Sequence, residues 1–140
     1  MPAVNSDANA APVLPMHRDR RGWVFEPIDA ARLTGQRNCH VVMTEPGAVR
    51  GNHYHRVGTE VCAILGPARV CVREPDGVSE CHVPAGVVWQ FVFSPGVAHA
   101  IQNPGPGPLL IVSFNDHAHD QARPDVVADV LIPPPAPPQA

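Results

Sequence analysis

Short apolar runs, separated by turns that contain proline or glycine, cover most of the chain. Nine runs of five to eight residues, rich in Val, Ile and Phe, recur about every ten residues, at 22–26, 38–44, 48–55, 59–65, 68–73, 78–83, 87–93, 97–103 and 109–115. The connections include "TEPGA", "EPDG" and "SPG", which provide the fixed or positive φ angles that tight turns need. Runs of this length and spacing predict an all-β sandwich or barrel.

One segment departs from this rhythm, and the two ends of the chain differ from the rest. "IDAARLTG", residues 28–35, predicts a short helix with Asp29 as its N-cap and Gly35 just after its end. Proline-rich ends of low hydrophobicity are typical of segments that do not pack. We therefore expect a flexible N-terminal tail over residues 1–13, one domain over residues 14–132 and a Pro-rich C-terminal tail over residues 133–140.

Composition restricts the partners and the compartment. The formal net charge is -3 and arginine supplies every positive side chain, so no basic patch suggests a nucleic-acid partner. No run resembles a signal peptide or is long enough to cross a bilayer, which predicts a cytoplasmic protein without a membrane partner. The four cysteines, none in a C-x-x-C pair, are expected to be small core residues: Cys39, Cys62, Cys71 and Cys81.

Three histidines and a glutamate form the candidate site. Side chains alternate along a strand, so His53 and His55 share one face and Tyr54 takes the other. Together with Glu60 and His99 they make a donor set that suits Zn²⁺, Mn²⁺, Fe²⁺ or Ni²⁺ and leaves positions open for water or substrate.

The chain has eight histidines, so a single H-x-H pair is weak evidence for a metal site. We interpret His40 and His82 as core or edge residues of strands. His117 and His119 follow the last apolar run among aspartates, which favours a solvated loop, with a place at the rim of the site as the alternative.

Two segments resemble the two motifs of the cupin family. Gly47–Gly66 has the pattern G-x5-H-x-H-x4-E-x5-G, and "SPGVAHAIQN", residues 94–103, has the pattern P-G-x2-H-x3-N. The second glycine of the first motif comes one residue early, and Ser94 stands where the second motif has proline. Neither departure removes a ligand. The resemblance implies a jelly-roll barrel that holds one divalent transition metal, Zn²⁺ ahead of Fe²⁺, Mn²⁺ or Ni²⁺, on His53, His55, Glu60 and His99.

Further segments are similar to cupins that act on sugar nucleotides. "DRRGWVFE", residues 19–26, resembles the opening of the dTDP-sugar epimerases and ketoisomerases. "RGNHYH", residues 50–55, and "NDHAHDQARPDVVADVLI", residues 115–132, resemble the cupin domain of the bifunctional capsular-polysaccharide-assembling reductase and epimerase, including a last short strand. This resemblance implies an epimerase or isomerase acting beside the ketone of a nucleotide-linked 4-keto-6-deoxy sugar. The sequence has no counterpart of the reductase half, so a free-standing cupin would need that activity from a separate protein or would have another function.

Within that function, Arg50 and His55 are the predicted catalytic residues. Inversion beside a ketone removes and returns one proton, and a divalent ion stabilises the enolate between the two steps. Arg50 would bind a diphosphate or orient the ketone, although regular alternation puts it on the face of Tyr54 unless Gly51 introduces a bulge. The predicted substrate-binding set is Arg50, Asn52, Trp89 and Gln90.

Other functions stay open at this stage. A ketoisomerase-like enzyme would use His53 and His55 to move protons and bind no metal. Three His and one Glu around Fe²⁺ also suit an oxygenase, and a non-catalytic cupin would bind a small molecule without turnover. The resemblance also implies a homodimer, because cupins of this size commonly pair through sheet edges, which covers exposed edge strands.

Overall fold

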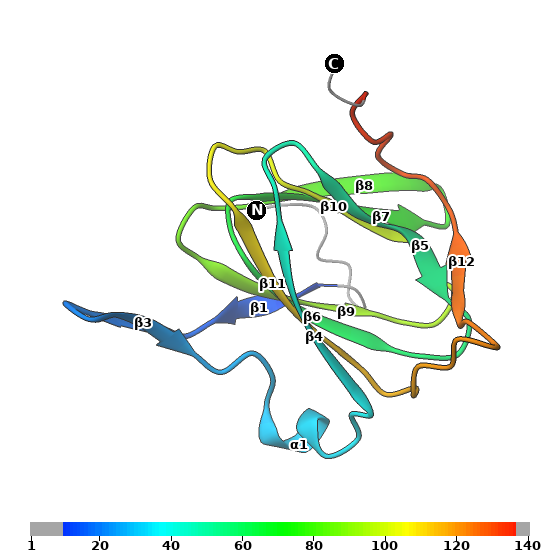
Figure 1. Cartoon of the computed structure of the whole chain (residues 1–140), viewed down its shortest axis with the longest axis horizontal. Coiled ribbons are helices and arrows are strands. Elements are labelled where there is room, and N and C mark those ends of the chain that lie inside the picture. The colour runs from blue at the N-terminus through cyan, green and yellow to red at the C-terminus, as the bar shows by residue number, and fades with distance from the viewer. Residues whose placement is uncertain (1–9, 137–140) are drawn as a thin grey trace.

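Two antiparallel five-stranded sheets face each other in the computed structural model, which describes residues 10–136 and shows only the backbone at residues 10–12 (Figure 1). In spatial order the first sheet contains β1 (Ala10–Leu14), β9 (Val88–Phe93), β6 (Glu60–Leu65), β11 (Leu109–Asn115) and β4 (Asn38–Thr44). The second contains β12 (Val126–Ala128), β5 (Val49–His55), β10 (His99–Gln102), β7 (Ala68–Glu74) and β8 (Gly77–Val83). From β4 onward the chain alternates between the two sheets, except at the β7–β8 hairpin.

All nine predicted strands are present, and within residues 10–136 three further strands join them. The chain begins its first sheet earlier than expected, because Ala10–Leu14 forms β1 and pairs with β9. The boundary predicted for the N-terminal tail is therefore too late, since pairing with β9 satisfies backbone groups that a free tail would leave to water. Residues 1–9 and 137–140 of the two expected tails lie outside the described residues.

The second additional strand, β2 (Met16–Asp19), pairs with β3 (Gly22–Phe25) in a hairpin that projects from the two sheets, drawn in blue at the left of Figure 1. The apolar pattern did not predict β2, because most residues of this strand are polar or charged. Trp23 and Val24 of this hairpin are exposed. The third, β12, is the short closing strand that the resemblance predicted, and it lies against β5.

The predicted helix is short. Helix α1 (Ala30–Leu33) starts at Asp29, whose carboxylate accepts the backbone N–H of Arg32 at 2.8 Å, as expected for an N-cap. No helix in the described part of the chain is long and apolar enough to span a membrane.

The apolar core fills the space between the sheets. Alternation along the strands brings inward-facing side chains from both sheets into one cluster, which includes Ile64, Val70, Val72, Phe91 and Phe93. Three of the cysteines are buried as predicted, but Cys39 is exposed. It lies on β4, the last strand of its sheet, where one face is open to solvent.

A candidate metal centre at one end of the sandwich

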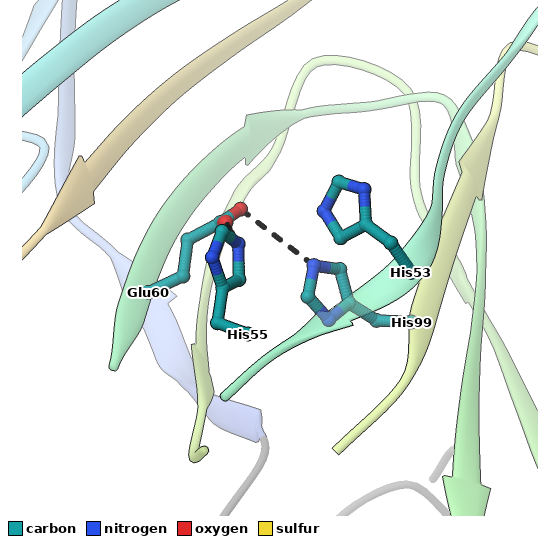
Figure 2. A group of neighbouring side chains, drawn as sticks. All are labelled: His53, His55, Glu60 and His99. Carbon is teal, nitrogen blue, oxygen red and sulfur yellow. Dashed lines mark hydrogen bonds and ion pairs between the residues drawn. The ribbon is translucent and has the colours of Figure 1, made fainter. Parts of the chain in front are cut away.

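His53, His55, Glu60 and His99 converge as the sequence predicted. Strand β5 contributes the first two, β6 in the opposite sheet contributes Glu60 and β10 contributes His99. One ligand atom from each of the four lies within 4.8 Å of the others, and the side chains point toward a common point (Figure 2). Gly66, the second glycine of the first motif, comes one residue early, and Glu60 nevertheless lies within the cluster.

Strand pairing aligns the histidines. The register of β5 and β10 sets His53 directly opposite His99, so both point to the same side of the sheet. Their ring centroids are 5.0 Å apart, and those of His53 and His55 are 5.1 Å apart. Glu60 begins β6, where inward positions continue with Cys62 and Ile64, so its carboxylate enters the site from the facing sheet.

His99 has one ring nitrogen within hydrogen-bond distance of a backbone carbonyl and the other without a hydrogen bond. Its Nδ1 lies 3.1 Å from the carbonyl oxygen of Val97, and its ring stacks on Phe93 with the centroids 3.9 Å apart. If Nδ1–H donates to that carbonyl, Nε2 presents a lone pair to the cluster. Nε2 is buried and makes no hydrogen bond, although it lies 3.8 Å from Glu60 Oε1 (Figure 2). Burial lowers the pKa of His99 to about 4, so the ring is neutral at pH 7 and suited to bind a metal.

Glu60 and His55 form a close pair. His55 Nε2 lies 2.6 Å from Glu60 Oε2, and the Cys62 thiol donates to Oε1 at 2.8 Å. Burial alone would raise the pKa of Glu60, but the hydrogen bond from His55, the nearby His99 and the bond from Cys62 lower it to about 2. Burial alone would lower the pKa of His55, but Glu60 and Asp125 together raise it above its usual value.

A cavity of about 360 Å³ opens over the four side chains. Its wall includes Arg50, whose guanidinium donates to Thr44 Oγ1 at 3.2 Å and to the carbonyl oxygen of Met43 at 2.9 Å. A bulge explains this position. Gly51 and Asn52 both have positive φ, and β10 pairs His99 with His53 but the next residue with Gly51, so one extra residue on β5 reverses the alternation. Arg50 therefore faces the cavity, as the bulge hypothesis required.

The other predicted substrate-binding residues lie away from the cavity, and these assignments were wrong in position. The Asn52 side chain accepts the N–H groups of Leu131 and Ile132 and donates to the Ile132 carbonyl, so it holds the C-terminal segment against the outside of β5. Gln90 points outward beneath α1, where it accepts from Arg32 and donates to the Pro27 carbonyl. Trp89 packs against the apolar core. Strand alternation separates Trp89 from Gln90, which excludes a shared lining role.

Several cavity residues have no counterpart in the sequence predictions. Asn115 and Asp125 both lie beside His55, and Cys62 lies beside Glu60. The spacing of Glu60 and Cys62 on one strand face could have revealed Cys62. Asp125 is 70 positions from His55, and no local pattern links the two. His117 and His119 line the cavity, which agrees with the alternative that put them at its rim, and His40 also lines it.

The donor set fits a divalent transition ion. Neutral imidazoles and ionised carboxylates, such as the three histidines and the glutamate of this cluster, are common ligands of Zn²⁺ and Fe²⁺ in sites that keep a coordination position open. Nε2 of His99 gives this fit a physical basis, because a buried ring nitrogen without a hydrogen bond is costly unless something binds it.

Comparisons with known proteins agree with the fold. The family model described as the polysaccharide biosynthesis C-terminal domain matches residues 17–127. A comparison with curated protein sequences gave no match.

Similar solved structures include three proteins of sugar metabolism. The capsular polysaccharide assembling protein CapF from Staphylococcus aureus has 22% identity and a TM-score of 0.63, over 86% of this chain and 34% of CapF. A dTDP sugar isomerase from Desulfovibrio desulfuricans has 14% identity and a TM-score of 0.69, over 97% of this chain and 89% of the isomerase. ChmJ, a 3'-monoepimerase from Streptomyces bikiniensis solved with dTDP, has 16% identity and a TM-score of 0.68, over 88% of this chain and 70% of ChmJ. The chain spans about a third of the length of CapF. The likeness to these structures confirms the predicted all-β cupin jelly roll.

Proposed function

The chain belongs to the polysaccharide biosynthesis C-terminal domain family, whose model covers most of its length, and we propose that it is a metal-dependent epimerase or isomerase. Its substrate would be a nucleotide-linked 4-keto-6-deoxy sugar, with the reaction at the carbon beside the ketone. The observation that carries the proposal is Nε2 of buried His99, which makes no hydrogen bond and points into a cluster with His53, His55 and Glu60. The names of the similar structures, a dTDP sugar isomerase and a monoepimerase solved with dTDP, support the substrate class.

In this proposal the four clustered side chains hold the ion, and other groups act on the substrate. A bound Zn²⁺, or Fe²⁺, Mn²⁺ or Ni²⁺ in its place, would polarise the ketone and stabilise negative charge on its oxygen. Arg50 supplies a cation in the cavity wall and is suited to bind the diphosphate or orient the ketone. A cavity of about 360 Å³ falls within the range typical of small-molecule sites.

The proton would leave the carbon beside the ketone and return to its other face through a titratable group of the cavity wall. The four ligands cannot serve while they bind the ion. His40, His117 and Asp120 line the same cavity and are the candidates for this role. Tyr54 is excluded from this role, because it lies between His53 and His55 on the opposite face of β5.

The contact between His55 and Glu60 favours a second candidate, a metal-independent isomerase. A 2.6 Å separation between Nε2 and Oε2, with the pKa of His55 raised, gives a paired base that can accept and return a proton without an ion. This is the role that the sequence assigned to His55 as a catalytic residue.

Metal content and isotope exchange, measured together, test both candidates. We expect untagged wild-type protein to contain one transition ion per chain by mass spectrometry, and His53→Ala and His99→Ala proteins to contain none. His82→Ala, which changes an exposed histidine bonded to Glu80, is the matched control and should retain the ion. Wild-type protein in D₂O should place deuterium beside the ketone of a dTDP- or UDP-4-keto-6-deoxyhexose.

The two measurements separate the possible outcomes. Exchange that needs the ion supports the metal-dependent enzyme. If metal-free protein catalyses deuterium exchange, and the His55→Ala substitution abolishes that exchange, the result supports the second candidate instead. A folded, metal-loaded protein that catalyses no deuterium exchange into any of the nucleotide sugars offered would overturn the enzyme proposal and leave a binding role.

We also propose that two copies associate. The support is apolar surface on the projecting hairpin, at Trp23 and Val24, and on β4, at Val41 and Met43, the last strand of its sheet. Apolar side chains and a free strand edge are features that association covers. Sedimentation analysis of the wild type measures the mass directly, and a monomer at all concentrations would contradict this part of the proposal.

A further inference from the structure

The segment that follows β11 returns across β5 and brings Asp125 next to the candidate metal centre. Asp125 directly precedes β12, and β12 pairs with β5 so that Val126 lies opposite His55. The Asp125 carboxylate is nearly buried and rigidly held, because Oδ1 accepts the N–H of Val57 and Oδ2 accepts the N–H of Gly58, both at 2.9 Å.

The imidazole of His55 lies between two carboxylates. Its Nε2 faces Glu60 and the ligand cluster, and its Nδ1 lies 3.7 Å from Asp125 Oδ2. That second separation is longer than a hydrogen bond. An imidazole that binds a metal through one nitrogen carries its proton on the other, and a carboxylate beside that nitrogen fixes the ring.

Asn115 favours the opposite arrangement. Its Oδ1 accepts the backbone N–H of His117 at 2.8 Å, which orients the amide so that Nδ2 faces His55 Nδ1 at 3.5 Å. A donor at that position favours an unprotonated Nδ1, which leaves the proton on Nε2 to be shared with Glu60. The two neighbours of Nδ1 therefore stabilise different tautomers of His55.

We propose that Asp125 is a positioning residue that accepts the Nδ1–H of His55 and so presents Nε2 to a divalent ion. The inference rests on the metal-binding role proposed above. In the metal-free protein the ring bonds to Glu60 through Nε2, and ion binding shifts its proton to Nδ1, where Asp125 accepts it. Asp125 acts through His55 and has no contact with the substrate in this role.

The same segment provides a matched control. Asp116 also anchors the 56–59 loop, because its carboxylate accepts the N–H of Thr59 at 2.8 Å, but it does so without facing the His55 ring in the contacts that the structure gives. Asp125→Asn and Asp116→Asn both remove a loop-anchoring charge with almost no change in volume. Only the first replaces the carboxylate beside Nδ1 with a neutral amide, whose nitrogen cannot accept a hydrogen bond.

The test measures Co²⁺ affinity by chelator competition, the visible absorption of bound Co²⁺, and the melting temperature of the metal-free proteins. We expect Asp125→Asn to weaken Co²⁺ binding by about 10- to 100-fold and to alter the Co²⁺ spectrum. Asp116→Asn should keep the affinity and the spectrum of the wild type, whatever its melting temperature. Equal affinities for Asp125→Asn and the wild type, or equal losses in both variants, would overturn the inference.

A measurement on the wild type keeps the inference falsifiable if Asp125→Asn does not fold. The ¹⁵N shifts of His55, assigned with His55→Ala, report which ring nitrogen carries the proton before and after Zn²⁺ is added. We expect the proton on Nδ1 in the Zn²⁺-loaded protein, and Zn²⁺ bound through Nδ1 would overturn the inference. Wild-type protein that binds neither Co²⁺ nor Zn²⁺ would overturn the metal site as well, which distinguishes the two failures.

Discussion

The two ends of the space between the sheets use the same strand alternation for different purposes. Along β6 the inward positions change from Glu60 at the cavity, through Cys62, to Ile64 in the apolar core. The apolar end buries rings and branched side chains, which stabilises the fold. The cavity end holds a buried imidazole nitrogen without a hydrogen bond, which costs stability in the metal-free protein. Stability and binding are therefore carried by different residues on the same strands.

The boundary between the two ends is narrow. Phe93 belongs to the apolar cluster, and its ring also stacks on His99. Arg50 reaches the cavity only through the bulge at Gly51 and Asn52.

Phe91→Ala should reduce the free energy of unfolding by about 3–5 kcal/mol, because it empties a fully buried position in the apolar cluster. Denaturant unfolding measures the loss. The variant should still bind one metal ion per chain at temperatures where it is folded. His53→Ala is the counterpart from the other end, and it should lose the ion while the free energy of unfolding stays within about 1 kcal/mol of the metal-free wild type. Loss of metal from folded Phe91→Ala would show that the two ends are not separable.

Gly51→Ala should disturb both ends together. Gly51 has a φ of +81°, and a Cβ there would lie 2.7 Å from the backbone oxygen of His99. We expect a loss of about 1–3 kcal/mol in the free energy of unfolding, with weaker metal binding because His99 must move. Gly47→Ala is the control, since its φ is +83° but a Cβ there meets nothing within 4 Å. If both variants bind metal as the wild type does, the close approach of Gly51 to β10 does not position His99.

The pH dependence of metal binding should follow His55. Burial opposes protonation of His55, but Glu60 and Asp125 together raise its pKa above the usual value, so a proton competes with the ion near neutral pH. The pKa of His99, lowered to about 4, keeps that ring neutral over the same range. Affinity should therefore decrease as the pH decreases below the pKa of His55, by about 10-fold per unit for one competing proton. Chelator competition between pH 8 and 5.5 measures the slope, and a slope of two protons would mean that a second ligand titrates there.

Much of the fold and the four clustered residues could be predicted because the signals are local. The apolar runs and their turns identified nine strands, and alternation assigned His53 and His55 to one face before any partner strand was known. The substrate-binding predictions were less successful. Trp89 and Gln90 are adjacent on one strand and so face opposite ways, and Asn52 holds the C-terminal segment instead of a substrate.

The sequence by itself determined an all-β chain and the residues able to bind a metal, because strand periodicity and ligand chemistry depend on neighbours within a few positions. The tertiary structure decided where Arg50 points, which nitrogen of His99 lacks a hydrogen bond, and that Asp125 lies beside His55. These features depend on the register of β5 with β10 and β12, which joins segments up to about 70 residues apart. Strand register is set by the packing of whole sheets, and one extra residue in a strand reverses the direction of the side chains beyond it.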